Sequence, residues 1–330
     1  MPTPPPKGLF PALITPFDPK GGIDWVSLKA LIESLLPVSD GLLIGEPLAG
    51  EGLSVPEDLR LRLFQGCLGT VGARKPLLLC PTAQTSEATL KSVEAGEKLI
   101  GGFPENGSVF WVDLPLWHHS NRKLPQFYKE WARRSSRPIL LYNHPRLITR
   151  LNHSMKRKNV RTAVLKKLVE NDRIVGLIQA GDFQRTLHYQ RAVRGRRDFR
   201  IYDGDEMNFL NQPSSSGVMS WGALLLPGEW KEIVTGSLIL TEDPERGFRI
   251  FNQSQKLKKL GEIIGLNPAA HLKYALFRLG RLSAARLWRE EEMPPTSDFS
   301  EMEAFLRENF SLQTSPANVI HERNFISGEP

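Results

Sequence analysis

The chain has 330 residues, of which 40% are hydrophobic and 24% charged, and this composition excludes a disordered chain, a collagen and a coiled coil. No stretch approaches the ~20 apolar residues that a membrane-spanning helix needs, and residues 1–7 lack the apolar core of a secretory signal. Two cysteines, Cys67 and Cys80, are too few for a disulfide framework, so we expect a cytoplasmic protein.

The formal net charge is +7, and part of the excess is local. Residues 153–161 form a basic run, and further arginines follow between residues 185 and 200. Such a run is typical of a solvated surface, and no aromatic side chains alternate with the charges as single-strand binding requires. We therefore do not expect nucleic acid as a partner, although the basic surface leaves binding of nucleic acid or of an acidic partner open as an alternative function.

Short apolar runs alternate with longer amphipathic stretches along the first two thirds of the chain. The runs begin roughly 20–36 residues apart, which predicts repeated strand–helix units and not hairpins. Helices are predicted over residues 24–36, 56–71, 86–99 and 123–135. The eight predicted strands cover residues 9–14, 41–44, 76–79, 108–112, 138–142, 174–178, 199–202 and 217–220.

Strands that are apolar throughout indicate a parallel sheet that is covered on both faces. Eight such units over residues 1–228 match a closed (β/α)8 TIM barrel, in which the active site lies at the carboxyl ends of the strands. An open doubly wound sheet is the alternative, but its glycine-rich phosphate loop is absent. Further helices are predicted over 242–261, 268–279 and 297–309. We therefore expect a C-terminal helical extension at 229–310, packed on the barrel, and a tail at 311–330.

Five motifs occur in the order and spacing of one known family. Together they resemble the dihydrodipicolinate synthase / N-acetylneuraminate lyase family of the class I pyruvate aldolase superfamily, and the resemblance runs from residue 8 to residue 290. The motifs are Ala12–Asp18 with Gly22–Asp24, Gly50–Ser54 with Glu57, Tyr142–Pro145, Ile174–Leu177 before Gln179–Asp182, and Asp203–Asp205.

This resemblance implies aldolase chemistry on pyruvate or on a substrate that yields pyruvate. In the family, a lysine on the sixth strand forms a Schiff base that serves as an electron sink. A tyrosine after the fifth strand relays protons, and a Thr-Thr pair after the second strand helps to bind the keto acid's carboxylate. The family also implies a homo-oligomer, either a dimer or a tetramer.

Most residues that carry this chemistry in the family are replaced here. The lysine position holds Ile178, and the two threonine positions hold Leu48 and Ala49. Tyr142 alone remains of the proton-handling residues. Since an imine needs an amine, the resemblance predicts a divergent member that lacks the Schiff-base lysine. Further departures are Pro115–Trp117 at the Pro-Tyr-Tyr motif, Leu147 at the arginine position and Leu224 at the asparagine position.

The other candidate site residues follow the ends of the same strands. Leu48–Gly50 still offers backbone amides to an anion. Arg146 lies one residue before the family's arginine position, Gln179 is a neutral donor and acceptor, and Ser220 ends the eighth strand. We assign these residues to substrate binding. Tyr142 has two interpretations, a proton relay or a buried phenol packed in the barrel mouth.

A metal ion would be another electron sink, as in class II aldolases. Cys80, Asp113, His118, His119 and His144 all follow strands, but the seven histidines show no ligand-type spacing. We therefore predict neither a metal nor a cofactor. Cys80 is expected to be a small buried apolar residue.

Three functional hypotheses follow. The first is a family homologue that has lost Schiff-base chemistry and binds a partner or a small anionic metabolite, such as a keto acid. The second is a lyase or aldolase-type enzyme that acts on a keto or hydroxy acid by a route without lysine. The third is a protein whose basic surface binds nucleic acid or an acidic partner.

Overall fold

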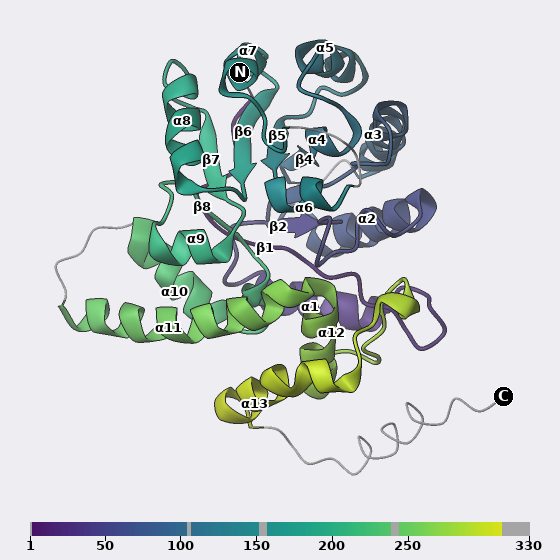
Figure 1. The fold of residues 1–330 in the computed structure, drawn as a ribbon. Helices are drawn as coiled ribbons and strands as arrows, with labels where there is room; N and C mark the ends of the chain where they lie inside the picture. The colour runs from purple at the N-terminus through teal and green to yellow at the C-terminus, as the bar shows by residue number, and fades with distance from the viewer. Residues whose placement is uncertain (1, 104–106, 152–156, 239–243, 312–330) are drawn as a thin grey trace.

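The computed structural model describes residues 2–103, 107–151, 157–238 and 244–311 (Figure 1). Eight parallel strands form one sheet in the order β1-β8-β7-β6-β5-β4-β3-β2. A bridge between Ala12, just after β1, and Leu43 on β2 joins the two ends of this order. The predicted (β/α)8 barrel is thus confirmed. The strands are β1 (Gly8–Pro11), β2 (Leu42–Ile44), β3 (Leu77–Leu79), β4 (Val109–Asp113), β5 (Ile139–Asn143), β6 (Ile174–Gln179), β7 (Arg200–Asp203) and β8 (Gly217–Ser220).

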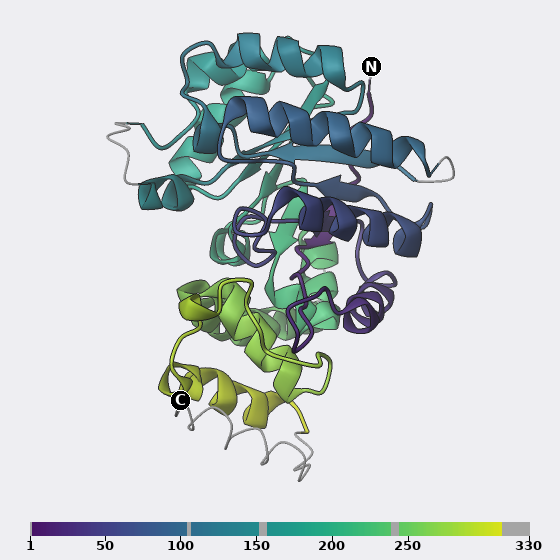
Figure 2. The ribbon, with the colours of Figure 1, turned by 90° about the vertical axis from the view of Figure 1, so that its right-hand side faces the viewer.

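Helices cover the outside of the sheet (Figures 1 and 2). Polar side chains cap the N-termini of several of these helices. Asp24, Thr85 and Asp182 each accept a hydrogen bond from a first-turn amide, which fixes where the helix starts. The outer helices are α1 (Trp25–Leu35), α2 (Glu57–Val71), α3 (Ser86–Gly101), α5 (Leu124–Arg134), α7 (Thr162–Leu168), α8 (Phe183–Val193) and α10 (Pro227–Leu238).

Short helices occupy four loops at the carboxyl ends of the strands. They position side chains around the barrel mouth, where (β/α)8 enzymes carry their sites. Two of them begin with a proline two positions after the last strand residue, and the fixed φ of proline suits the first helical position. These helices are α4 (Pro115–His118), α6 (Pro145–Arg150), α9 (Glu206–Asn211) and the 3-10 helix η1 (Gly222–Leu224).

The C-terminal helices pack against one side of the barrel (Figure 2). The first helix of this extension, α11, contacts α9 and α10 of the barrel as well as α12, and α12 contacts α13. Lys273 on α12 is fully buried and pairs with Glu51 in the loop after β2, which ties the extension to the barrel mouth. The elements are α11 (Pro244–Leu266), α12 (Pro268–Arg278), the 3-10 helices η2 (Glu290–Glu292) and η3 (Thr296–Phe299), and α13 (Ser300–Asn309).

Most predicted elements agree with the structure to within three residues. The first strand, β1, ends at Pro11, three residues before the predicted end at residue 14, because beyond Pro11 the chain makes only the single bridge at Ala12. Position 228 lies in the first turn of α10, which packs on β1 and β8. Residues 312–330 of the tail and residues 153–156 of the basic run lie outside the described residues. None of the described helices has the length and apolar character to cross a membrane.

Candidate functional site

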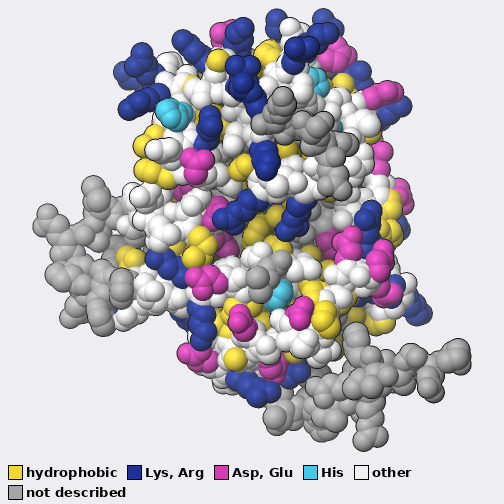
Figure 3. All heavy atoms as spheres, viewed as in Figure 1, with side chains coloured by type: hydrophobic (Ala, Val, Ile, Leu, Met, Phe, Trp, Pro, Cys, Tyr) yellow, Lys and Arg dark blue, Asp and Glu magenta, His cyan; other side chains and the backbone are white. Residues whose placement is uncertain are grey.

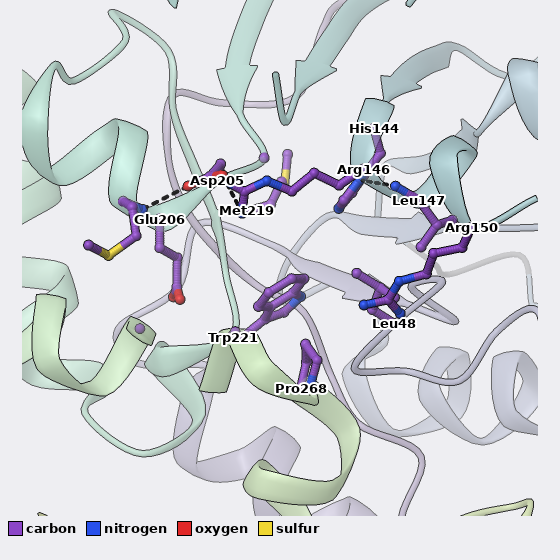
Figure 4. Close-up of a pocket in the computed structure, with 14 residues that line it drawn as sticks. Leu48, His144, Arg146, Leu147, Arg150, Asp205, Glu206, Met219, Trp221 and Pro268 are labelled. Atoms are coloured by element: carbon purple, nitrogen blue, oxygen red, sulfur yellow. Dashed lines mark hydrogen bonds and ion pairs between the residues drawn. The ribbon is translucent and has the colours of Figure 1, made fainter. Parts of the chain in front are cut away.

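The loops at the carboxyl ends of β2, β5, β7 and β8, together with α11 and α12, surround a small pocket (Figure 4). It encloses about 90 Å³, enough for several water molecules or one small metabolite. Leucine, methionine and tryptophan form much of its wall, and five polar side chains reach it. The polar residues are His144, Arg146, Arg150, Asp205 and Glu206, and the apolar ones are Leu48, Leu147, Met207, Met219, Trp221 and Pro268.

Tyr142 and Ile178 lie side by side beneath this pocket. They are register partners on β5 and β6, and both are buried. Gly204 lines the pocket, and a Cβ atom there would lie 2.7 Å from Ile178 Cγ2 and 3.0 Å from Tyr142 Cε2. Ile178 is therefore an aliphatic side chain packed against the tyrosine. Burial raises the pKa of Tyr142 well above its ordinary value, so the phenol is neutral.

The carboxylate of Glu46 binds the backbone amides of Leu48 and Ala49, which we expected to bind a substrate anion. Its Oε2 accepts hydrogen bonds from the N–H groups of Leu48 at 2.8 Å and Ala49 at 2.7 Å. Tyr142 donates to its Oε1 over a long 3.5 Å. Gly50 follows closely, since a Cβ atom there would lie 2.7 Å from the nitrogen of Glu46. Burial outweighs these donors and raises the pKa of Glu46 to about 7.

Arg146 and Arg150 extend from α6 at the pocket rim (Figure 4). Arg146 is 83% exposed, and its Nη1 lies 3.8 Å from Asp205 Oδ2. Figure 3 shows Lys and Arg side chains on both sides of an apolar hollow in the middle of this face. His144 caps α6 by accepting from the N–H of Leu147 at 3.2 Å, and burial lowers the pKa of His144 to about 4, so its imidazole is neutral. The positive charge at the rim therefore comes from the two arginines.

Glu206 faces the arginines from the other wall of the pocket. The Ser220 hydroxyl donates to Glu206 Oε1, and the N–H of Gly222 donates to the same oxygen at 2.7 Å. Ser220 accepts in turn from the N–H of Ala223 at 3.0 Å. Ser220 is thus committed to Glu206 and η1. Burial outweighs its donors and raises the pKa of Glu206 to about 7.

Gln179 does not join the group around the pocket. It follows Ile178 on β6, so its side chain points to the opposite face of the strand. There its Oε1 accepts from Asn143 Nδ2 at 2.8 Å, and Asn143 also donates to Asn159 at 2.8 Å. Its Nε2 is buried and has no hydrogen-bond partner among the described residues.

The five side chains considered as metal ligands are spread over the rim. His144 lies at the pocket, whereas Asp113 and His118 contact each other on the far side, between β3 and β4. His119 lies 2.6 Å from the Ser120 carbonyl, and the Cys80 thiol is buried, which raises its pKa to about 12. In the described part of the chain, no three His, Cys, Asp or Glu side chains come together as a metal site.

Sequence reasoning missed three residues of this site. Arg150 follows Arg146 by four residues, so both lie on one face of α6, and this spacing was the available signal. Glu46 and Glu206 carry no such signal. Their burial depends on the loops folding over them.

Comparison with known proteins identifies one family. The model of the dihydrodipicolinate synthetase family matches residues 5–236. The chain is 27% identical over 285 residues to the 4-hydroxy-tetrahydrodipicolinate synthase of Heliobacterium modesticaldum, covering 83% of this chain and 86% of that protein. It is 26% identical over 305 residues to the enzyme of the same name from Bdellovibrio bacteriovorus, covering 86% and 96%.

Solved structures share the fold. The dihydrodipicolinate synthase of Thermotoga maritima superposes with a TM-score of 0.77 at 21% identity, covering 92% of this chain and 99% of that one. The 4-hydroxy-tetrahydrodipicolinate synthase of Methylacidiphilum fumariolicum superposes with a TM-score of 0.75 at 23% identity, covering 96% and 98%.

Proposed function

Because the chain belongs to the dihydrodipicolinate synthetase family, we propose that it is a divergent member that has lost Schiff-base aldolase chemistry and binds a small anionic metabolite at the barrel mouth. The observation that carries the first part is Ile178. This side chain is fully buried beside Tyr142, and the motif resemblance described above aligns it with the family's lysine. A hydrocarbon there offers no amine to a keto acid, so no imine forms and the carbanion has no electron sink.

No lysine among the described residues lines the pocket above Ile178. Lys273 is buried, but its ammonium pairs with Glu51 and donates to the Arg286 carbonyl at 2.8 Å. It also lies 4.2 Å from the centre of the Phe17 ring. These contacts enclose the amine and hold it away from the pocket, which Lys273 does not line.

The two arginines of α6 support an anionic ligand. Arg146 and Arg150 are both exposed at the rim, and the weak contact of Arg146 with Asp205 leaves its guanidinium able to bind a carboxylate. The amides of Leu48 and Ala49 already bind Glu46, so they do not supply the anion site. The proposed ligand therefore enters between α6 and α9, above Gly204, with its acidic group on the arginines.

Borohydride trapping tests the lost chemistry. Purified protein is incubated with pyruvate and sodium borohydride, and the intact mass is measured. We expect no adduct, whereas the Heliobacterium modesticaldum relative treated in parallel is the positive control. A reduced pyruvate adduct on a lysine of this chain would overturn the proposal, and peptide mapping would identify the amine.

Thermal unfolding tests the binding. A ligand that binds only the folded state raises the melting temperature, so pyruvate, 2-oxoglutarate and gluconate are added in turn. We expect a rise with at least one of them and its loss in the Arg146→Ala/Arg150→Ala variant. The matched control is Arg191→Ala/Arg194→Ala, which removes the same charge from the exposed surface at α8. An equal rise in both double variants would contradict binding through α6.

The expected homo-oligomer is part of the same proposal. Trp25 and Val26 on α1 are 44% and 82% exposed, which is unusual for apolar side chains of this size and supports contact with a second copy. Light scattering after size-exclusion chromatography measures the mass directly. A dimer or tetramer is expected, and a monomer at micromolar concentration would contradict it. The cytoplasmic location stays a prediction.

A further inference from the structure

Three side chains meet on the other side of the barrel mouth, between β3 and β4. Ser86 Oγ lies 3.1 Å from His118 Nδ1, and His118 Nε2 lies 3.1 Å from Asp113 Oδ1. We propose that these residues form a second, hydrolytic site, in which Ser86 is a nucleophile that accepts acyl groups from small esters. This site goes beyond the anion pocket and shares no residue with it.

The fold brings the three residues together. Ser86 is the first residue of α3, which follows β3, whereas Asp113 ends β4 and His118 ends the short helix α4. Because β3 and β4 are parallel neighbours, the segments that leave their carboxyl ends lie side by side. The ring of Phe127 packs against His118 with the ring centres 5.0 Å apart, which fixes the plane of the imidazole.

The hydrogen bonds of Asp113 decide which nitrogen of His118 is free to act as a base. The carboxylate accepts from Thr82 Oγ1 at 2.8 Å and from the Tyr128 hydroxyl at 2.6 Å. Burial opposes its ionisation, but the neighbouring His118 and these donors hold the pKa of Asp113 below its ordinary value. An ionised carboxylate only accepts, so whenever the His118 ring carries a single proton, that proton lies on Nε2. The lone pair of Nδ1 then faces Ser86.

Exposure follows the order that such a site needs. Ser86 is half-buried at the surface, whereas the side chains of His118 and Asp113 are both 0% exposed. A substrate thus meets the hydroxyl first, while the base and the residue that positions it stay dry. Ser86 also lies at the positive end of the 16-residue helix α3, where the N–H of Glu87 has no acceptor among the described residues. That amide is suited to stabilising an oxyanion.

The reaction has two steps. Ser86 Oγ bonds to the carbonyl carbon of the ester, its proton passes to His118 Nδ1, and the carbonyl electron pair moves to oxygen. When the pair returns, the bond to the leaving alcohol breaks, and His118 gives the proton to that alcohol. Water then attacks the acyl-serine in the same way, His118 takes and returns its proton, and the free acid and Ser86 are released.

A fastening role is the alternative for Ser86. Its Oγ also lies 3.1 Å from the carbonyl oxygen of His118, and its single hydrogen serves one of the two acceptors at a time. If Ser86 only ties α3 to α4, the hydroxyl has no enhanced reactivity. The two roles differ in chemistry, so a serine-directed electrophile distinguishes them.

The experiment is labelling of the full chain with a fluorophosphonate. Phosphonylation forms a bond between Ser86 Oγ and phosphorus, expels fluoride and leaves the serine proton on His118. We expect one added phosphonyl group, mapped to Ser86 by peptide mass spectrometry, and no label on protein unfolded in urea. No label on the folded protein, or a label on another residue alone, would overturn the proposal.

Variants separate a catalytic role from a structural one. We expect Ser86→Ala to abolish labelling and His118→Asn to slow it by about 100-fold or more, the usual contribution of a general base. His119→Asn is the matched control, since His119 also packs on Phe127 but contacts neither Ser86 nor Asp113, and it should label at the original rate. Equal rates for both histidine variants in folded protein, checked by circular dichroism, would overturn the proposal.

Asp113 is assigned a positioning role, which hydrolysis of p-nitrophenyl acetate tests. Asp113→Asn should lower kcat and leave KM unchanged, because the carboxylate orients the base and does not touch the ester. A change confined to KM would contradict this role. The result does not bear on the anion pocket, because none of these residues lines it.

Discussion

Two sides of the barrel mouth each bury a carboxyl group, and the pKa values of the two groups shift in opposite directions. Asp113, between β3 and β4, has a pKa below its ordinary value, whereas burial raises the pKa of Glu206, beside β7 and β8, to about 7. Both side chains are enclosed, so burial alone does not explain the difference. Asp113 accepts from the Thr82 and Tyr128 hydroxyls and pairs with His118. Glu206 accepts from one hydroxyl and one amide and has an acidic neighbour in Asp205. The partners therefore decide the direction.

The two sides of the mouth are suited to different chemical roles. A carboxylate that stays charged holds His118 in one tautomer, which a proton-transfer site requires. Glu206, whose pKa lies near 7, changes charge within the physiological range and lines the pocket with Arg146 and Arg150. An anion that binds there is expected to bring a proton with it. The following substitutions test this contrast, from the largest expected effect to the smallest.

Asp113→Asn should give the largest loss of stability, about 3–4 kcal/mol near pH 7. The amide presents a donor to Thr82, Tyr128 and His118, and it removes a charge that these groups stabilise. The lowered pKa means that this contribution is present above the ordinary value of 3.8 and fades as the pH falls below it. Urea unfolding at pH 7 and pH 3.5 measures both.

The control for that substitution is Asp205→Asn. Asp205 Oδ1 caps α9 by accepting from the amides of Met207 and Asn208, and asparagine caps equally well. We expect a loss within about 0.5 kcal/mol. A similar loss in the two variants would show that Asp113 is not specially stabilised.

Glu206→Gln should change the pH dependence of stability and not only its level. In the wild-type protein the raised pKa means that the stabilising proton is fully bound below the ordinary value of 4.5 and is lost as the pH rises through about 7. Glutamine keeps the acceptor for Ser220 and Gly222 without a charge. Relative to the wild type, the free energy of unfolding of the variant should rise by about 3 kcal/mol as the pH goes from 4.5 to 8. Parallel stability curves would refute the raised pKa.

Ser220→Ala should have a smaller effect, a loss of about 1–2 kcal/mol. It removes one donor to Glu206 and the acceptor for the Ala223 amide. The loss should be greater at pH 8 than at pH 5, because the missing donor stabilises the charged carboxylate. Ser237→Ala is the control, since Ser237 donates to the Ile233 carbonyl on α10 and should show no pH dependence. Equal losses at both pH values would contradict the assignment.

Arg146→Ala should have the smallest effect on stability, within about 0.5 kcal/mol, because an exposed ion pair at 3.8 Å contributes little. Its effect belongs to ligand binding, as tested above. A loss above about 1.5 kcal/mol would show that Arg146 is part of the fold and not free for a ligand.

Much of the scaffold could be predicted from the sequence. Eight apolar runs with helical spacers define the barrel, and the motif around Tyr142 and the run ending at Ile178 place these two residues on neighbouring strands. Prediction worked here because strand pairing in a barrel follows chain order. The orientation of Gln179 follows from the same alternation, since its neighbour Ile178 points inward.

The contacts made by loops could not be predicted in this way. Nothing in the sequence near Glu46 shows that its carboxylate turns back onto the amides of Leu48 and Ala49. Ser86 and His118 are 32 residues apart, and only the side-by-side exit of α3 and α4 brings them within hydrogen-bond distance. Such contacts depend on rotamers that the surrounding packing selects.

The sequence by itself determined the barrel, its relationship to one family and the aliphatic residue at position 178, because these depend on periodicity and on residue identity. The tertiary structure alone decided which polar groups are charged and which face each other. Asp113 and Glu206 are both acidic residues at strand ends, and their opposite pKa directions arise from the donors that the folded loops supply. Electrostatic interactions act through space at short range, and distances between loops are set only when the chain has folded.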